Sequence, residues 1–173
     1  LNTIETLGNP AGASVHLGSF YHLAFARKLA DTLAASETWT GERAVFLQGL
    51  EGYDDIRPGY TKVAEWDGDE LSDFEIETAA LGMDVDEAAL AVDDVTADSA
   101  EITEAVLAGE RTDAVADAFH LNAALRLYAG GAVPGLEEGV EVARKTVADG
   151  DAAAVLADLR AFRPSEAVGV TDG

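Results

Sequence analysis

The chain has 173 residues, of which 48% are hydrophobic and 7% aromatic, so it can bury an aliphatic core and is not a disordered acidic tail. It contains no cysteine, which excludes disulfides, thiolate metal sites and cysteine nucleophiles. Its 33 acidic and 11 basic residues give a formal net charge of -22, which disfavours unassisted binding to nucleic acid or to anionic membranes.

The acidic excess, together with a content of only three lysines, predicts a protein adapted to high salt, because dissolved ions screen the repulsion between like charges. No secretory leader and no apolar stretch long enough to span a membrane is recognisable in the sequence, so a cytoplasmic location is expected. The only methionine is Met83, and we therefore expect the chain to be part of a longer protein.

The first part of the sequence predicts an α/β architecture. Short apolar segments bounded by glycines or turn residues predict strands at Ser14–Leu17, Arg43–Gln48, Thr61–Trp66 and Leu71–Ile76. Apolar residues at helical spacing predict a helix over Tyr21–Ala35. The turn residues Asp67-Gly68-Asp69 predict a hairpin between the last two strands.

The second part is predicted to be mainly helical. Helices are expected at Ala100–Ala108, from a cap at Thr112 or Asp113 to about Ala129, after Pro134-Gly135, and at Asp151–Phe162. In the helix after Pro134-Gly135, the residues expected to face the core are Leu136, Val140, Val142 and Val147. The acidic segment Asp84–Ser99 has no clear pattern, and the tail Ser165–Gly173 is expected to be frayed.

The segment Gln48–Gly59 carries the most informative pattern. It follows the carboxyl end of a predicted strand, where open α/β sheets bind their ligands. Its glycines allow sharp turns, and Asp54 and Asp55 place two carboxylates next to each other. Such carboxylates suit Mg²⁺ together with substrate phosphates and water. The alternative is that the two side chains only solvate a turn.

Six segments distributed along the chain share a pattern with one family. They are LNTIETLGNPAG (Leu1–Gly12), RAVFLQGLEGYDD (Arg43–Asp55), TKVAEWDGDEL (Thr61–Leu71), AEITEAVLAGE (Ala100–Glu110), AVADAFHLNAALRLYAGG (Ala114–Gly131) and LEEGVEVARKTVADGDA (Leu136–Ala152). In this order they resemble the C-terminal half of anthranilate phosphoribosyltransferases, whose fold is shared with pyrimidine nucleoside phosphorylases. The resemblance implies that residues 1–164 form the C-terminal part of an α/β domain with a mixed sheet flanked by helices.

The resemblance also implies a function. Members of the family transfer phosphoribose from phosphoribosyl pyrophosphate to anthranilate in tryptophan biosynthesis, and they use magnesium. The family's Asp-Glu magnesium pair falls on Asp54 and Asp55, so that Asp55 is one methylene shorter than the usual glutamate. Gln48 stands where the family commonly has histidine, and Glu5-Thr6-Leu7 replaces its Gly-Pro-Leu near the acceptor site.

Other parts of the family pattern have no counterpart in the sequence. The glycine-rich pyrophosphate loop, the anthranilate-binding arginine and the helical domain that forms the family's homodimer all precede the matched region. We therefore expect the complete protein, rather than this chain alone, to be active and to dimerise. Two alternatives remain: a non-catalytic relative that acts as a binding module, for example for nucleic acid, and a transferase with another aromatic or nucleobase acceptor.

The remaining polar and aromatic candidates are given structural roles. No catalytic side chain is predicted, and the isolated histidines His16, His22 and His120 do not have the spacing of metal ligands. Asn122 is expected to meet a backbone group. Arg57 could pair with a carboxylate or with a substrate phosphate, and the ion pair with a carboxylate is favoured because the family resemblance does not single this residue out. The residues expected to serve in packing are Trp39 and Trp66.

Overall fold

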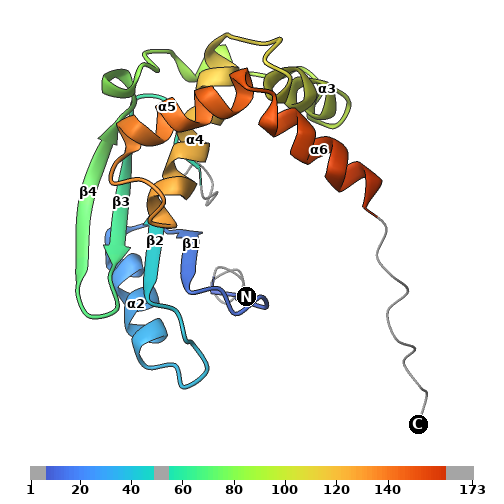
Figure 1. The fold of residues 1–173 in the computed structure, drawn as a ribbon. Coiled ribbons are helices and arrows are strands. Elements are labelled where there is room, and N and C mark those ends of the chain that lie inside the picture. Colours follow the sequence, from blue (N-terminus) through green and yellow to red (C-terminus); the bar gives the residue numbers. More distant parts are fainter. Residues whose placement is uncertain (1–6, 49–54, 163–173) are drawn as a thin grey trace.

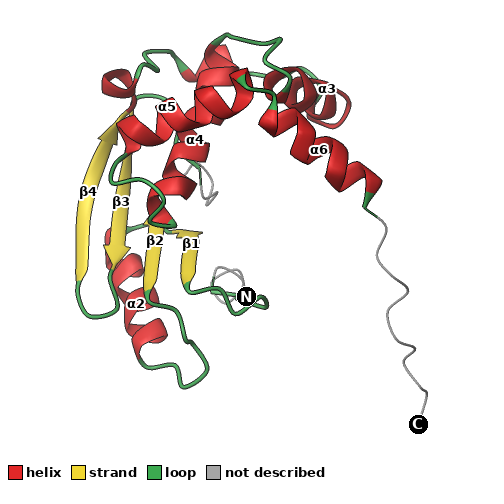
Figure 2. Ribbon diagram, viewed as in Figure 1, coloured by secondary structure: helices red, strands yellow, loops and turns green. Residues whose placement is uncertain are grey.

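The structure is a computed structural model that describes residues 7–48 and 55–162. Its first part contains β1 (Val15–Ser19), α2 (Leu23–Ala34), β2 (Arg43–Leu47), β3 (Tyr60–Trp66) and β4 (Leu71–Glu77). The short helices η2 (Thr78–Leu81) and η3 (Glu87–Leu90) are followed by α3 (Val95–Leu107), α4 (Ala114–Ala129), α5 (Leu136–Ala148) and α6 (Asp151–Ala161) (Figure 1). The helices α3 to α6 follow the described strands in the sequence. Figure 2 shows the strands in yellow and the helices in red.

The sheet is mixed, as predicted, with the strand order β1-β2-β3-β4. β1 and β2 are parallel and are connected through α2, whereas β2, β3 and β4 pair antiparallel. The predicted hairpin is confirmed: Asp67 Oδ1 accepts hydrogen bonds from the backbone N–H groups of Asp69 (3.1 Å) and Glu70 (2.9 Å). Gly68 adopts a φ of 102°, a conformation that glycine tolerates without strain.

Helices cover both faces of the sheet, and each face has its own core. The core between the sheet and α4, here called the α4-side core, has as buried members Val45, Leu47, Ile56, Val63, Ile76, Met83, Leu121, Ala124, Leu125, Ala129 and Val140. The α2-side core comprises Phe20, Ala26, Leu29, Ala30, Leu33, Ala44, Phe46, Ala64 and Trp66. Successive residues of β2 alternate between the two cores, as the pleat of a strand buried on both faces requires.

The helix starts follow their capping residues. Asp113 rather than Thr112 caps α4, since its carboxylate accepts from the N–H groups of Val115 and Ala116. The side chain of Arg111 binds the same carboxylate and lowers the pKa of Asp113. α3 begins at Val95 and not at the expected Ala100, because Asp94 supplies an N-cap that the sequence analysis missed.

The antiparallel pair α4 and α5 packs closely around a glycine. A Cβ atom on Gly139 would lie 2.8 Å from the Cβ of Ala124, so the approach of the two helices depends on the missing side chain. Val140 is buried at 5% exposure, but Val142 is 38% exposed, and its expected inward orientation is wrong. Two residues along a helix correspond to a rotation of about 200°, which carries Val142 away from the face that contains Val140.

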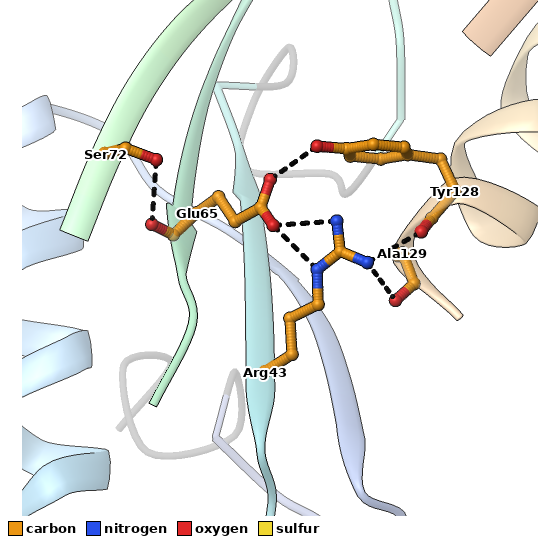
Figure 3. A network of polar contacts seen from close by, with 5 residues as sticks. All are labelled: Arg43, Glu65, Ser72, Tyr128 and Ala129. Carbon is orange, nitrogen blue, oxygen red and sulfur yellow. Dashed lines mark hydrogen bonds and ion pairs between the residues drawn. The ribbon is translucent and has the colours of Figure 1, made fainter. Parts of the chain in front are cut away.

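A polar network attaches the end of α4 to the sheet (Figure 3). The guanidinium of Arg43 donates to Glu65 Oε1 (2.7 Å) and to the carbonyl oxygens of Tyr128 (2.8 Å) and Ala129 (3.0 Å). The Tyr128 hydroxyl donates to Glu65 Oε2 (2.7 Å). Burial and the neighbouring Glu65 carboxylate raise the pKa of Tyr128, which keeps its hydroxyl protonated. Arg43 thereby donates to the Ala129 carbonyl at the helix terminus and adds a second donor to the Tyr128 carbonyl, which also accepts from the N–H of Gly131 (3.0 Å).

The outer strand β4 presents acidic side chains along its exposed positions. Asp73, Glu75 and Glu77 are exposed, whereas Ile76 is buried in the α4-side core. Glu75 forms a cross-strand ion pair with Lys62 of β3 at a distance of 3.6 Å, and both side chains are exposed to solvent. The outer edge of the described sheet therefore carries a row of acidic residues.

The last helix, α6, packs against α3 at the side of the molecule away from the sheet (Figure 1). An ion pair between Arg160 and Glu104 joins these two helices. The predicted frayed tail, 165–173, lies outside the described residues. None of the helices in the described ranges has the length and apolar character required to cross a membrane.

Candidate functional site

The carboxyl ends of β1 and β2 meet at one edge of the sheet, because the two strands are parallel. The N–H of Phe20 donates to the carbonyl of Leu47 (2.8 Å) just beyond the paired residues. Gln48 then donates from Nε2 to the carbonyl of Tyr21 (3.2 Å), and its own N–H donates to the carbonyl of Lys62 (2.9 Å). Gln48 thus links the ends of three strands at the edge where α/β proteins place their ligands.

Of the two predicted metal ligands, the structure places one. Asp54 lies outside the described residues, and Asp55 is exposed at the start of the segment that returns to β3. Two residues further on, the N–H of Arg57 donates to Oγ1 of the buried Thr61 (3.2 Å). The next residue of β3, Lys62, is the one whose carbonyl accepts from the N–H of Gln48. Asp55 therefore follows the carboxyl end of β2 and lies at this edge.

The backbone next to Asp55 is held from α4. Asn122 Oδ1 accepts the N–H of Ile56 (2.9 Å), and Asn122 Nδ2 donates to the carbonyl of Ile56 (3.4 Å) and to that of Ala118 (3.0 Å). The Ile56 side chain is 2% exposed and belongs to the α4-side core. The prediction that Asn122 meets a backbone group is confirmed.

A second clamp holds the other end of the same segment, and the sequence analysis missed it. The hydroxyl of the buried Thr78 accepts from the N–H of Gly59 (2.9 Å) and lies 3.2 Å from the Gly59 carbonyl, to which it donates. Gly59 has a φ of 88°, so the chain reverses there in a conformation that favours glycine. A threonine between a strand and a short helix gives no sequence signal for such a distant contact.

The expected ion pair of Arg57 is wrong for the described part of the chain. Arg57 Nε donates to the carbonyl of Tyr60 (3.3 Å), and its guanidinium lies 5.6 Å from the centre of the Tyr60 ring. The arginine is therefore attached to its own turn and remains at the edge that carries Asp55. A positive charge at this edge is compatible with an anionic ligand.

The histidines do not form a site. His16 is 8% exposed and makes an edge-to-face contact with Trp39 (5.5 Å between ring centres), and His22 contacts Tyr21. His120 lies beside an apolar cavity of about 410 Å³ between helices, and neither of its buried ring nitrogens has a hydrogen-bond partner within the described ranges. Burial lowers the pKa of His120, and Arg144 lowers it further.

The tryptophans pack as predicted. Trp66 is 5% exposed in the α2-side core, and Trp39 lies against the same core. A cavity of about 600 Å³ lies near Trp39, between α2 and the segment before β1, and Leu7 is part of its lining. Leu7 is the described part of the segment expected near the acceptor site, and it lies at the end of the sheet opposite to Asp55. Glu5, Thr6 and Asp54, the other members of the two predicted regions, lie outside the described residues.

Asp55 is the predicted cation ligand that the structure places at this edge. Across residues 7–48 and 55–162, no three His, Asp or Glu side chains are arranged to hold a metal. Mg²⁺ is usually bound by one or two carboxylates, with waters and substrate phosphates as the remaining ligands. The exposed Asp55 carboxylate is one donor of the kind that such a site uses.

Comparisons with known proteins identify a family. Residues 1–153 match the family described as "Glycosyl transferase family, a/b domain". The anthranilate phosphoribosyltransferase of Natronomonas pharaonis is 31% identical over 164 residues, which make up 94% of this chain and 48% of that protein. The chain spans about half the length of the curated relatives it matches.

Solved structures agree with this match. The anthranilate phosphoribosyltransferase of Thermus thermophilus superposes with a TM-score of 0.76 at 29% identity, covering 93% of this chain and 46% of that one. The Saccharomyces cerevisiae enzyme in complex with PRPP and Mg superposes with a TM-score of 0.62 at 20% identity, covering 79% of this chain and 38% of that one. The latter comparison concerns the fold alone.

Proposed function

Because the chain belongs to the glycosyl transferase family, a/b domain, we propose that it is the C-terminal half of an anthranilate phosphoribosyltransferase that acts in tryptophan biosynthesis. In the complete protein, the amine of anthranilate attacks C1 of the ribose while the bond from C1 to pyrophosphate breaks. The observation that carries this proposal is the family match over residues 1–153, with Asp55 exposed at the carboxyl edge of β2.

The metal proposed for this reaction is Mg²⁺, held by Asp54 and Asp55. When bound, Mg²⁺ neutralises charge on the departing pyrophosphate. The net charge of -22 supports this proposal, since an acidic protein repels an anionic substrate unless a cation is bound between them. The relative from S. cerevisiae, which was solved with PRPP and Mg, also supports it.

The complete protein tests the proposal through the fluorescence of phosphoribosylanthranilate in concentrated KCl. We expect product at saturating anthranilate, phosphoribosyl pyrophosphate and Mg²⁺. Asp54→Asn and Asp55→Asn should each lower kcat/KM by roughly 100-fold, the scale of losing one group that stabilises transition-state charge. Asp73→Asn, which removes an exposed carboxylate on β4, is the matched control and should change kcat/KM by less than about twofold.

Three outcomes would contradict the proposal in different ways. No product with anthranilate but product with another aromatic amine or a nucleobase would change the acceptor and keep the transferase. No product with any acceptor would favour a binding module. If Asp55→Asn and Asp73→Asn change kcat/KM by the same factor, Asp55 is not a metal ligand.

A further inference from the structure

The partly buried Asn122 makes a contact across the fold, between α4 and the segment that follows Asp55. It lies within α4, and its carboxamide reaches a residue 66 positions earlier, where it binds both the N–H and the carbonyl of Ile56. The side chain thus pairs with Ile56 in the way that a neighbouring strand would. A third hydrogen bond, to the Ala118 carbonyl one helical turn away, fixes the carboxamide itself (3.0 Å).

The group that Asn122 holds belongs to the peptide bond between Asp55 and Ile56. The N–H of Ile56 lies in the same plane as the carbonyl of Asp55, because the peptide unit is planar. The Ile56 side chain is buried in the α4-side core, which fixes the position of this unit, and Asn122 fixes its rotation. The Asp55 side chain projects from this fixed unit to an exposed position.

We infer that Asn122 is a positioning residue that orients the Asp55 carboxylate for a divalent cation, an inference that rests on the proposed function. A metal ligand loses affinity when the groups that orient it are removed. The position requires asparagine, since the carboxamide oxygen must accept from the Ile56 N–H while the carboxamide nitrogen donates to the Ile56 and Ala118 carbonyls. Aspartate has no donor for the two carbonyls, and alanine leaves the Ile56 N–H without its partner.

The test uses the complete protein and the variants Asn122→Asp, Asn122→Ala and Asn122→Ser. Tyr128→Phe is the matched control, because it lies on the same helix and loses one hydrogen bond, to Glu65, at the opposite end of the strands. Two measurements are made on proteins shown to be folded by circular dichroism. They are the hydrogen-exchange rate of the Ile56 amide and the affinity for Mn²⁺, measured by electron paramagnetic resonance in the presence of pyrophosphate.

In folded Asn122→Ala and Asn122→Ser we expect faster exchange of the Ile56 amide and, through the loss of an orienting partner, an affinity for Mn²⁺ lowered by about tenfold. Asn122→Asp keeps an acceptor for the Ile56 N–H and loses only the donor for the two carbonyls, so exchange should change less in this variant. In Tyr128→Phe both quantities should stay within about twofold of the unsubstituted protein. The Mg²⁺ concentration that gives half-maximal activity should rise in Asn122→Ala and Asn122→Ser, whereas a purely structural role would lower only the active fraction. If Asn122→Ala does not fold, Asn122→Ser provides the same test.

The results separate this inference from the proposed function. If Asp55→Asn abolishes Mn²⁺ binding and the Asn122 variants bind Mn²⁺ normally, the positioning role is wrong and the proposed function stands. If exchange of the Ile56 amide does not change in the Asn122 variants, the clamp itself is absent in solution. If the unsubstituted protein binds no Mn²⁺ with pyrophosphate, the proposed metal site fails and the inference fails with it.

Discussion

Arg43 and Glu65 face each other from neighbouring antiparallel strands, with 2.7 Å between the guanidinium and the carboxylate oxygen. Their side chains are only 22% and 16% exposed, so solvent screens the pair weakly. The same guanidinium supplies donors for the last turn of α4. The pair therefore connects the sheet to the helix that holds Asn122.

We expect Arg43→Met to lower the free energy of unfolding by about 3 kcal/mol, because it leaves the Glu65 carboxylate without its cationic partner and the Ala129 carbonyl without its donor. Urea denaturation at constant KCl measures the change. The control is Lys62→Met, which breaks the exposed pair with Glu75 and should cost less than about 1 kcal/mol. Equal losses in both variants would show that the Arg43 network adds no more stability than the exposed pair.

Gly139→Ala should destabilise the protein by about 1–3 kcal/mol, although alanine is normally the better helix residue. The new methyl group would overlap the Cβ of Ala124 and force α4 and α5 apart. The same methyl group would also lie 2.9 Å from the Cα and 3.0 Å from the carbonyl oxygen of Ala124. Thermal unfolding of Gly139→Ala is compared with that of Gly135→Ala, whose new Cβ would meet nothing within 4 Å. A melting temperature of Gly139→Ala no lower than that of Gly135→Ala would contradict a direct clash.

Stability should fall in acid partly through His120. Burial lowers the pKa of this imidazole in the folded protein, with a further decrease from Arg144 that Asp117 partly offsets. The unfolded chain therefore takes up the proton first as the pH falls, and stability is lost from about pH 7 down to the lowered pKa. Above the ordinary pKa of histidine, His120 no longer makes the free energy of unfolding depend on pH.

The measurement compares the free energy of unfolding of the unsubstituted protein with that of His120→Phe between about pH 8 and pH 5. Carboxylates titrate in both proteins and cancel in the difference, so the variant should show the flatter pH dependence. If the free energy of unfolding changes with pH by the same amount in both proteins, His120 does not contribute to the loss of stability in acid.

The charge of -22 predicts that added KCl stabilises the fold. Raising the salt from about 0.1 M to 1 M shortens the Debye length from about 10 Å to 3 Å and weakens repulsion between the surface carboxylates. The melting temperature should therefore increase with KCl concentration. A maximum at the lowest KCl concentration would refute adaptation to salt, and an equal increase with sucrose would assign the effect to solvent exclusion instead of screening.

Local patterns were sufficient to predict most of the elements. The strands of the sheet and the hairpin at Gly68 follow from short-range signals, and their bounds agree with the predictions to within a few residues. Helix starts were less certain, because several aspartates precede α3 and only the structure shows that Asp94 is the one that caps it. The exposed Val142 shows that apolar composition does not specify which side of a helix is buried.

The candidate site was predictable only in part. The position of Asp55 at the strand edge follows from the order of the elements and from the family resemblance. The clamps at Asn122 and Thr78 join residues that are 66 and 19 positions apart, and nothing in the local sequence specifies such partners. An ion pair was expected for Arg57 because it lies next to the acidic residues and the family resemblance does not single it out; among the described residues, its Nε donates instead to the Tyr60 carbonyl in its own turn.

The acidic positions of β4 have a consequence for self-association of the protein. An outer strand can join the strands of another molecule, and the carboxylates of Asp73, Glu75 and Glu77 oppose this association. Replacing them by amides would remove that repulsion from a strand whose backbone is otherwise suited to intermolecular pairing. The triple variant Asp73→Asn/Glu75→Gln/Glu77→Gln should therefore form fibrillar or amorphous precipitate at concentrations at which the unsubstituted protein stays in solution.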